Sequence, residues 1–502
     1  MKRHFALATI LMACAATCFA QAIFGEKPRL VVGVVVDQMR WDYLSRYYDR
    51  LGDDGFKRLV TQGYSLNNCL INYIPTVTAV GHTSIYTGST PAFHGICGNN
   101  FMIDGRKTYC TQDDSVQTVG SDLPRGKESP HHLLATTIGD QLRLHTDFRS
   151  KVIGVSYKDR AAILPAGRSA NAAYWIDTKH RCFITSSYYM QELPQWVKNF
   201  NARMSTDQQV KAAGENIGLS PLCGTLTTDM AIAALKSEQL GKGAETDMLC
   251  VSYSQTDVIG HKFSTRGQHT DDAYLTLDKD IARLLQALDE QVGQGNYLLF
   301  LTADHGGAHN WRFMQEHRLN GGPWMADEIV RQAEAHVASL YGNQKPVILK
   351  NLDCRYFLDR QGIKEQGLDY QKVKDAIIEV LRQAPHAQYV IDYEHAATQS
   401  RPGFLRERVL LGYNYRRSGD ILYIPEPGHY EYGPWSSPIG TTHGVWNPYD
   451  SHIPLLFYGW KISHGATSRE VHITDIAPTV CQLLHIQQPN ACIGEPISEI
   501  VK

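Results

Sequence analysis

The chain has 502 residues, of which 43% are hydrophobic and 20% are charged, a composition typical of a globular protein with a sizeable core. Its 49 basic and 51 acidic residues give a formal net charge of -2 at pH 7 and form no long block of one sign. This balance excludes a general nucleic-acid-binding or anionic-membrane surface, so we expect no nucleic-acid partner. Any anion that the protein handles must meet positive charge locally.

The first twenty residues predict a leader segment. A basic start precedes an apolar run that ends at small residues, which indicates a signal peptide over residues 1–20 with cleavage before Gln21. We therefore expect a secreted or periplasmic protein. The alternative is an outer-membrane lipoprotein, because the letters LMAC end at Cys14 and resemble a lipoprotein box. No later apolar stretch approaches the ~20 residues of a membrane-spanning helix, so no transmembrane span is expected in the mature chain.

The cysteines favour neither a metal site nor a redox motif. The chain has 11 of them, and Cys14 and Cys18 lie in the expected leader. No C-x-x-C pair occurs, which leaves thiolate zinc sites and thioredoxin-type motifs without support. Export makes disulfides possible, with at least one thiol free or intermolecular because an odd number remains, and the pairing stays open.

Three apolar segments that run into aspartates indicate the fold. The segments LVVGVVVD, MLCVSYSQTD and YLLFLTADHG are typical of parallel strands buried on both faces, and they lead to Asp37, Asp257 and Asp304. With helices between them, they predict an α/β fold with a doubly wound, mostly parallel sheet flanked by helices. Ligands of such sheets gather at the carboxyl ends of the strands, so we expect the three aspartates along one crevice.

The long stretches between these strands predict α+β insertions. We expect one catalytic domain over residues 21–502, with insertions near 105–150 and 308–440. The second insertion contains a helical pattern from Tyr370 to Gln383. Residues 408–427 read as two strands joined by a Ser-Gly-Asp turn.

Three histidines accompany the aspartates. Asp257 and His261 are four residues apart, so both reach one face of a helix. His305 follows Asp304 directly and precedes two glycines, and His443 lies in GTTHG. Each match is weak alone, since a capping aspartate or an exposed histidine is the commoner outcome. Three Asp and three His together favour a site for two divalent ions, with zinc as the natural choice. Two such ions could stabilise the attacking and the leaving oxygens of a displacement at phosphorus.

Seven motifs, in order from about residue 30 to the C-terminus, carry a family resemblance: VVVDQMR, PTVTAVGHTSIYTG, HGICGNN, YKDRAAILPAG, QTDVIGH, TADHGG and GTTHGVWNPYDSHIPLLFYG. The chain resembles the alkaline phosphatase superfamily and, within it, the bacterial secreted phosphatases of the PafA type, which use a threonine nucleophile. The resemblance implies that the nucleophile is Thr78. It implies that one zinc, which also holds the nucleophile, is bound by Asp37, Asp304 and His305, and the other by Asp257, His261 and His443.

The physical chemistry of a helix start suits Thr78. A hydroxyl there lies among free N–H groups and the positive end of the helix dipole, which favour a phosphate. The alternative is that Thr78 is only an N-cap, a role worth ~1 kcal/mol, and Thr76 is a neighbouring rival that only the motif pattern rejects. Thr83 and Ser84 lie deeper in the expected helix and are expected to pack or to bond to backbone carbonyls.

Positive charge for a phosphate comes from YKDR. Lys158 and Arg160 are two residues apart, and in an extended segment both point to the same side. The resemblance implies that both contact non-transferring phosphoryl oxygens and that Asn99 donates a further hydrogen bond, although Asn100 is adjacent. It also includes Asp450, which we expect to be a structural support.

These patterns predict a zinc-dependent phosphate monoester hydrolase that releases inorganic phosphate from broad small phosphomonoesters through a covalent phosphothreonine intermediate. Three non-bridging oxygens of a monoester would meet Lys158, Arg160 and Asn99, whereas a diester offers one fewer. The alternatives are a phosphodiesterase or nucleotide pyrophosphatase of the same superfamily, and a non-catalytic zinc- or phosphate-binding surface protein. The sequence leaves the oligomeric state open.

Overall fold

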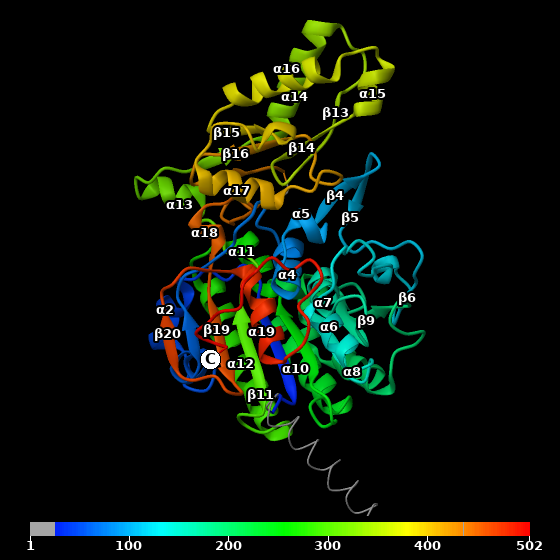
Figure 1. The fold of residues 1–502 in the computed structure, drawn as a ribbon, viewed down its shortest axis with the longest axis vertical. Coiled ribbons are helices and arrows are strands. Elements are labelled where there is room, and N and C mark those ends of the chain that lie inside the picture. The colour runs from blue at the N-terminus through cyan, green and yellow to red at the C-terminus, as the bar shows by residue number, and fades with distance from the viewer. Residues whose placement is uncertain (1–25, 435, 502) are drawn as a thin grey trace, which may run out of the picture.

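The protein is described by a computed structural model that covers residues 26–434 and 436–501. The expected signal peptide and the lipoprotein alternative at Cys14 lie outside these described residues. Figure 1 shows a large α/β body with a smaller α+β part at one end of the long axis.

A ten-stranded sheet forms the centre of the α/β body. Its middle five strands, β11, β1, β10, β7 and β8, are all parallel, and antiparallel pairs begin at β19 on one side and β9 on the other. This confirms the predicted mostly parallel sheet. The strand order is β20 (Gly465–Thr467), β2 (Tyr64–Leu66), β19 (Leu455–Gly459), β11 (Tyr297–Thr302), β1 (Leu30–Val36), β10 (Asp247–Tyr253), β7 (Val152–Ser156), β8 (Ala172–Asp177), β9 (Cys182–Ser186), β6 (Thr118–Val119).

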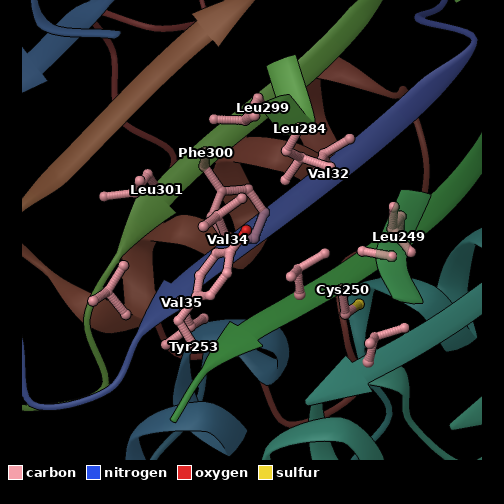
Figure 2. Packing of buried hydrophobic residues seen from close by; sticks show 14 of the residues in the cluster. Val32, Val34, Val35, Leu249, Cys250, Tyr253, Leu284, Leu299, Phe300 and Leu301 are labelled. Atoms are coloured by element: carbon pink, nitrogen blue, oxygen red, sulfur yellow. The ribbon is translucent and has the colours of Figure 1, made fainter. Parts of the chain in front are cut away.

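The central strands are buried along their whole length. Every residue of β1 is buried, as the uninterrupted run of branched apolar side chains predicts for a strand covered on both faces. Figure 2 shows Val34 and Val35 of β1 among side chains of β11 and β10, including Phe300 and Tyr253. This rigid centre fixes the positions of the residues that follow each strand.

Helices cover both faces of the sheet. Ser252 and Tyr253 are consecutive in β10, so their side chains point to opposite faces. The Ser252 hydroxyl contacts His82 of α4 (Thr78–Thr87) at 2.7 Å, and the Tyr253 hydroxyl contacts Thr228 of α10 (Leu222–Ser237) at 2.9 Å. The other helices of this body are α2 (Tyr43–Tyr47), α3 (Phe56–Gln62), α5 (Pro91–His94), α6 (Ile138–His145), α7 (Asp159–Ala166), α8 (Gln195–Thr206), α9 (Gln208–Ala213), α11 (Gln255–Phe263), α12 (Gln268–Gln291), α18 (Pro448–Ser451), α19 (Ile476–Leu483).

The smaller α+β part has its own sheet and core. Its antiparallel order is β13 (Ile348–Leu352), β14 (Arg355–Leu358), β16 (Ile421–Pro425), β15 (Ala387–Asp392). The helices of this stretch of the chain are α13 (Trp311–Glu316), α14 (Ala326–Tyr341), α15 (Arg360–Glu365), α16 (Tyr370–Gln383), α17 (Gly403–Gly412). The helix expected from Tyr370 to Gln383 has those bounds.

One expectation in this region is wrong. The sequence was expected to form two strands between residues 408 and 427, but the first of them is the end of helix α17, and only β16 is a strand. Leu405 and Val409, four residues apart, are both buried, which is the spacing of a helix face. The apolar letters from Val409 to Leu411 hid this helical spacing, because helix α17 begins before them, at Gly403.

Three small sheets of two or three strands complete the described structure. These are β12 (Gly322–Trp324) with β17 (His429–Glu431), β18 (His452–Ile453) and β21 (Val471–His472) with β3 (Cys69–Leu70), and β4 (Asn100–Ile103) with β5 (Arg106–Tyr109). All nine cysteines in the described part of the chain are free. Over the same residues, no helix combines the length and the apolar character needed to cross a membrane.

Candidate active site

The aspartates predicted from the sequence gather at one edge of the central sheet. Asp37 directly follows β1, and Asp304 lies two residues beyond β11. Asp257 lies in the first turn of α11, which follows β10. Because β1 pairs with both β10 and β11, three neighbouring parallel strands bring these carboxylates to a common crevice.

One group of candidate ligands consists of Asp257, His261 and His443, whose ligand atoms all lie within 4.8 Å of one another. Asp257 Oδ1 lies 3.1 Å from His261 Nε2, its neighbour one turn along α11, and 3.5 Å from His443 Nε2. His443 comes from a loop that is held against α11, since Thr441 N–H donates to the Gly260 carbonyl over 3.1 Å. This is the set that the family resemblance implied for one of the two ions.

The second group surrounds His305. Its Nε2 atom lies 3.5 Å from Asp37 Oδ1, 3.4 Å from Asp304 Oδ2 and 3.5 Å from Thr78 Oγ1. Asp37 and His305 also form a ligand group with Asp257, so the two groups are contiguous. All four members of the second group are at most 1% exposed.

Backbone carbonyls fix the orientation of all three histidines. The Nδ1 atom of His261 lies 2.8 Å from Thr441 O, that of His443 lies 2.7 Å from Thr76 O, and that of His305 lies 2.9 Å from Gly306 O. A carbonyl only accepts, so each Nδ1 carries the proton and each Nε2 presents its lone pair to the carboxylates. This is the arrangement in which a histidine ligates a metal through Nε2.

Helix α4 begins at Thr78. Val77 is its N-cap and makes no side-chain capping bond, and Gly88 ends it in the left-handed conformation with φ 62°. Thr78 is therefore the first helical residue and not the cap. Gly81, one turn along, faces the Asp304 carbonyl so closely that a Cβ atom would lie 2.1 Å from that oxygen. Only glycine lets the helix start approach the Asp304 backbone this closely.

The other hydroxyls of this stretch have structural partners. Thr76 donates to the Val445 carbonyl over 2.8 Å, and Thr83 donates to the Ala79 carbonyl over 2.6 Å. His82 lies 3.2 Å from Asp304 Oδ2, but its Nδ1 is 2.9 Å from the Thr78 carbonyl, which must accept its proton. Of the hydroxyls near the helix start, Thr78 alone among the described residues points at the candidate ligands.

Asn99 lies at the same helix start. Its Oδ1 accepts a hydrogen bond from the N–H of Ala79 over 3.0 Å, which satisfies one of the four free donors of the first turn. With its oxygen held there, the amide nitrogen is left as a donor. Asn100 instead begins β4 and uses its carbonyl to accept from Arg355 over 3.4 Å. The geometry thus favours Asn99 over its neighbour as a phosphate donor.

Lys158 lies between the two ligand groups. Its ammonium donates to Asp37 Oδ2 over 2.7 Å and to Asp257 Oδ2 over 2.6 Å. All three side chains are at most 8% exposed. A cation in this position offsets part of the repulsion between two buried carboxylates.

Arg160 reaches the site differently from the sequence expectation. Lys158 is extended and caps α7, but Arg160 lies in the first turn of that helix, so the two do not share an extended strand. Arg160 Nη1 donates to the Tyr109 hydroxyl over 2.8 Å, and that hydroxyl donates to Asp159 Oδ1 over 2.6 Å. The acidic Asp159 in the first turn is a helix-start signal that the K-x-R spacing obscured.

The electrostatics of the site indicate a need for cations. Burial, together with Asp304, raises the pKa of Asp37 well above its ordinary value. Burial also opposes ionisation of Asp257, but His261 and Lys158 outweigh it and hold that pKa well below the ordinary range. Burial lowers the pKa of His305 to about 3, which keeps its imidazole neutral and able to ligate.

Two unpartnered oxygens test whether these residues fit a metal. Asp37 Oδ1 and Asp304 Oδ2 are buried and accept no hydrogen bond from any described residue. Both face His305 Nε2, and unpartnered buried carboxylate oxygens are costly unless an ion or water meets them. Imidazole with carboxylate is a donor set of divalent transition metals. The residues present therefore fit a metal centre.

Sequence reasoning missed one residue beside the ligands. Gln38 Nε2 donates to Asp257 Oδ1 over 2.6 Å, and its backbone N–H donates to Asp304 Oδ1 over 3.2 Å. Its φ of 63° is left-handed, an unusual conformation for glutamine. The signal in the sequence was that Gln38 directly follows Asp37, just beyond the end of strand β1. Asp450, expected as a support, accepts from the N–H groups of Gly444 and Val445 and so holds the His443 loop.

The chain is similar to known proteins over most of its length. The sequence matches the family of type I phosphodiesterases and nucleotide pyrophosphatases over residues 31–446. A protein from Myroides odoratus named calcium-transporting ATPase is 45% identical over 526 residues, which cover 95% of this chain and 95% of that protein. Alkaline phosphatase PafA from Elizabethkingia meningoseptica is 42% identical over 522 residues, again with 95% of each chain covered.

The fold is also similar to a solved structure. The crystal structure of wild-type alkaline phosphatase PafA matches with a TM-score of 0.91 and 41% sequence identity, over 95% of this chain and 100% of that chain. The agreement extends over nearly the whole described chain, including the α+β part.

Proposed function

Because the chain belongs to the family of type I phosphodiesterases and nucleotide pyrophosphatases, we propose its substrates and mechanism from the geometry of its site. The enzyme is an alkaline phosphatase, as are relatives that match over almost its full length. It is thus a hydrolase of phosphate monoesters with a metal cofactor. The finer proposal is a broad activity on small phosphomonoesters that depends on two zinc ions.

Thr78 is the proposed nucleophile. The observation that carries this assignment is its hydroxyl at the first residue of α4, 3.5 Å from His305 Nε2 and beside two buried carboxylate oxygens without partners. Two bound zinc ions would supply charge to lower the pKa of the hydroxyl and to stabilise the leaving oxygen. The Thr78 oxygen attacks phosphorus as the ester P–O bond breaks, which gives phosphothreonine and releases the alcohol. Water then attacks phosphorus and breaks the bond between phosphorus and the Thr78 oxygen, which releases phosphate.

The ligands are assigned as two sets. Asp37, Asp304 and His305, with Thr78, would hold one ion. The contiguous group around Asp257 would hold the other, through its own carboxylate and the Nε2 atoms of His261 and His443. The unprotonated Nε2 atoms and the unpartnered carboxylate oxygens support this division.

Three residues are proposed to bind the phosphoryl group. Asn99 has its oxygen fixed by the start of α4, which leaves its amide N–H groups for a phosphoryl oxygen. Arg160 is held by Tyr109. Lys158 is engaged by Asp37 and Asp257, and cations bound by those carboxylates would free its ammonium for the substrate. Together they suit the dianionic end of a monoester.

Export completes the proposal. A signal peptide over residues 1–20 would place the enzyme in the periplasm or outside the cell, and an acylated Cys14 would instead anchor it as a lipoprotein. Mass determination of the mature N-terminus separates these two products.

The experiment for the nucleophile compares zinc-loaded wild type with Thr78→Ala on a phosphate monoester, with zinc content measured on the same samples. We expect Thr78→Ala to retain most of its metal and to lose at least about 1,000-fold in kcat/KM. Thr76→Val is the matched control, since it removes the neighbouring hydroxyl, and it should keep most of its activity. Full activity of Thr78→Ala would show that this threonine is only part of a helix start.

A phosphodiesterase is the second candidate, because the matched family is described by that activity. A diester lacks the third phosphoryl oxygen that Arg160 and Lys158 would meet. Arg160→Ala should therefore lose about 10- to 100-fold in kcat/KM on a monoester and much less on a matched diester. A wild type that prefers the diester would reverse the substrate assignment and leave the metal site in place.

A further inference from the structure

A cavity of about 370 Å³ borders the site beside His443. Segments far apart in the chain enclose it: the end of β13, strand β17 and the loop that carries His443. Three carboxylates line it, and none of its lining residues is a lysine or an arginine. These carboxylates belong to Asp353, Glu431 and Asp450. A phosphatase handles anions, so an acidic cavity next to its metal ligands requires an explanation.

One wall of the cavity carries a buried acceptor that is not used. Asp450 is 0% exposed, and its Oδ2 accepts from the N–H groups of Gly444 and Val445. Its Oδ1 has no hydrogen-bond partner among the described residues. The Oδ1 atom of Asn351, also in the cavity lining, is buried and unpartnered too. Two unused acceptors in one cavity point to a ligand that donates hydrogen bonds.

The other two carboxylates differ in their compensation. Asp353 Oδ2 is 2.8 Å from Arg355 Nη2, so its charge is balanced. Glu431 forms no ion pair or hydrogen bond through its side chain within the described part of the chain. Burial, with Asp353 and Asp327 nearby, raises the pKa of Glu431 to about 7. Above about pH 7, Glu431 therefore carries a negative charge without an ion-pair partner among the described residues.

The position of the cavity selects its occupant. His443 belongs to the ligand group of Asp257 and His261, whereas Thr78 belongs with the group around His305. In a displacement at phosphorus, the leaving oxygen departs on the side away from the nucleophile. A cavity that borders His443 therefore lies where the alcohol part of the ester would extend.

We propose that this cavity binds the alcohol part of phosphate monoesters that carry an ammonium group, such as phosphorylated amino alcohols, with Glu431 as the charge partner of that ammonium. The inference rests on the proposed phosphatase function and names its preferred substrate class. Asp450 and Asn351 supply acceptors for the ammonium protons.

The test compares 2-aminoethyl phosphate with propyl phosphate, in which a methyl group replaces the ammonium, at about pH 8 with zinc-loaded enzyme. The readout is the ratio of the two kcat/KM values, so the intrinsic reactivity of each ester cancels between variants. Glu431→Gln should lower this ratio about tenfold, equivalent to about 1.4 kcal/mol. Asn351→Asp adds a carboxylate to the same wall and should raise it.

Glu426→Gln is the matched control, because Glu426 is half-exposed, lies five residues away and does not line the cavity. It should leave the ratio at the wild-type value. The inference is overturned if Glu431→Gln has the same Tm as wild type and a kcat/KM ratio within twofold of the wild-type ratio. If Glu431→Gln does not fold, the test is Asn351→Asp, and the inference is overturned if this variant does not raise the kcat/KM ratio. Wild type that hydrolyses neither ester would instead refute the proposed function.

Discussion

Lys158 offers a direct test of the electrostatics of the site. In this structure its ammonium bridges Asp37 and Asp257 at 2.7 and 2.6 Å, in a place where all three side chains are nearly inaccessible. Lys158→Met removes the charge and keeps most of the volume. Two buried carboxylates then repel each other without a cation between them, unless bound metal ions replace it.

The magnitude follows from the burial of the three groups. Removing one partner of a buried ion pair costs about 3–5 kcal/mol. Unfolding entropy of about 2 cal/mol/K per residue amounts to about 1 kcal/mol/K for a chain of this size, so Tm should fall by about 3–5 °C in the presence of EDTA. With zinc bound, the carboxylates have their cations, and the loss should shrink to less than half.

Thermal unfolding of wild type and variant, each with EDTA and with zinc, measures this difference. The α+β part provides a matched control, since Lys374 is 0% exposed and bridges Asp392 at 3.0 Å and Glu394 at 2.6 Å. Lys374→Met should lower Tm equally in both conditions. Equal losses for Lys158→Met with and without zinc would refute the reasoning, because they would show that the metal does not take over the role of the ammonium.

Three further outcomes are expected. Gly81→Ala should push the start of α4 away from the Asp304 carbonyl, which a Cβ would approach to 2.1 Å, so bound zinc per chain should fall; undiminished zinc content would contradict this close approach. Tyr109→Phe removes the hydroxyl that holds Arg160 and should raise KM for a monoester several-fold with a smaller change in kcat, whereas a change in kcat alone would argue against a binding role. The pKa of Glu431 is about 7 in the fold against an ordinary 4.5, so its stabilising contribution is complete below pH 4.5 and is lost as pH rises through 7. Glu431→Gln should therefore flatten the fall in Tm between about pH 5 and 8. If Tm depends on pH in the same way in wild type and in the variant, the raised pKa assigned to Glu431 is wrong.

Features that depend on local sequence could be predicted. The apolar run after residue 30 predicted strand β1, because only a strand covered on both faces tolerates such a run. The four-residue spacing of Asp257 and His261 predicted their proximity, since a helix fixes it. The convergence of Asp37 and Asp304 followed from the rule that parallel strands end at one edge of a sheet.

Features that depend on contacts between distant segments could not be predicted in the same way. The bond from Gln38 to Asp257 requires a left-handed backbone at a residue that rarely adopts one. The place of Arg160 required knowledge that α7 begins one residue earlier. The acidic cavity brings together Asp353, Glu431 and Asp450, which lie far apart in sequence and share no pattern that would pair them.

The backbone of Thr76 holds the ring of His443 across 367 residues of sequence. A chain made from its N-terminus therefore contains Thr78, the proposed nucleophile, and Asp37 long before His443 is synthesised. Until that loop docks, the ligand group of Asp257, His261 and His443 is incomplete. Maturation of the enzyme is thereby coupled to completion of the chain, and products truncated before this loop cannot assemble the full centre.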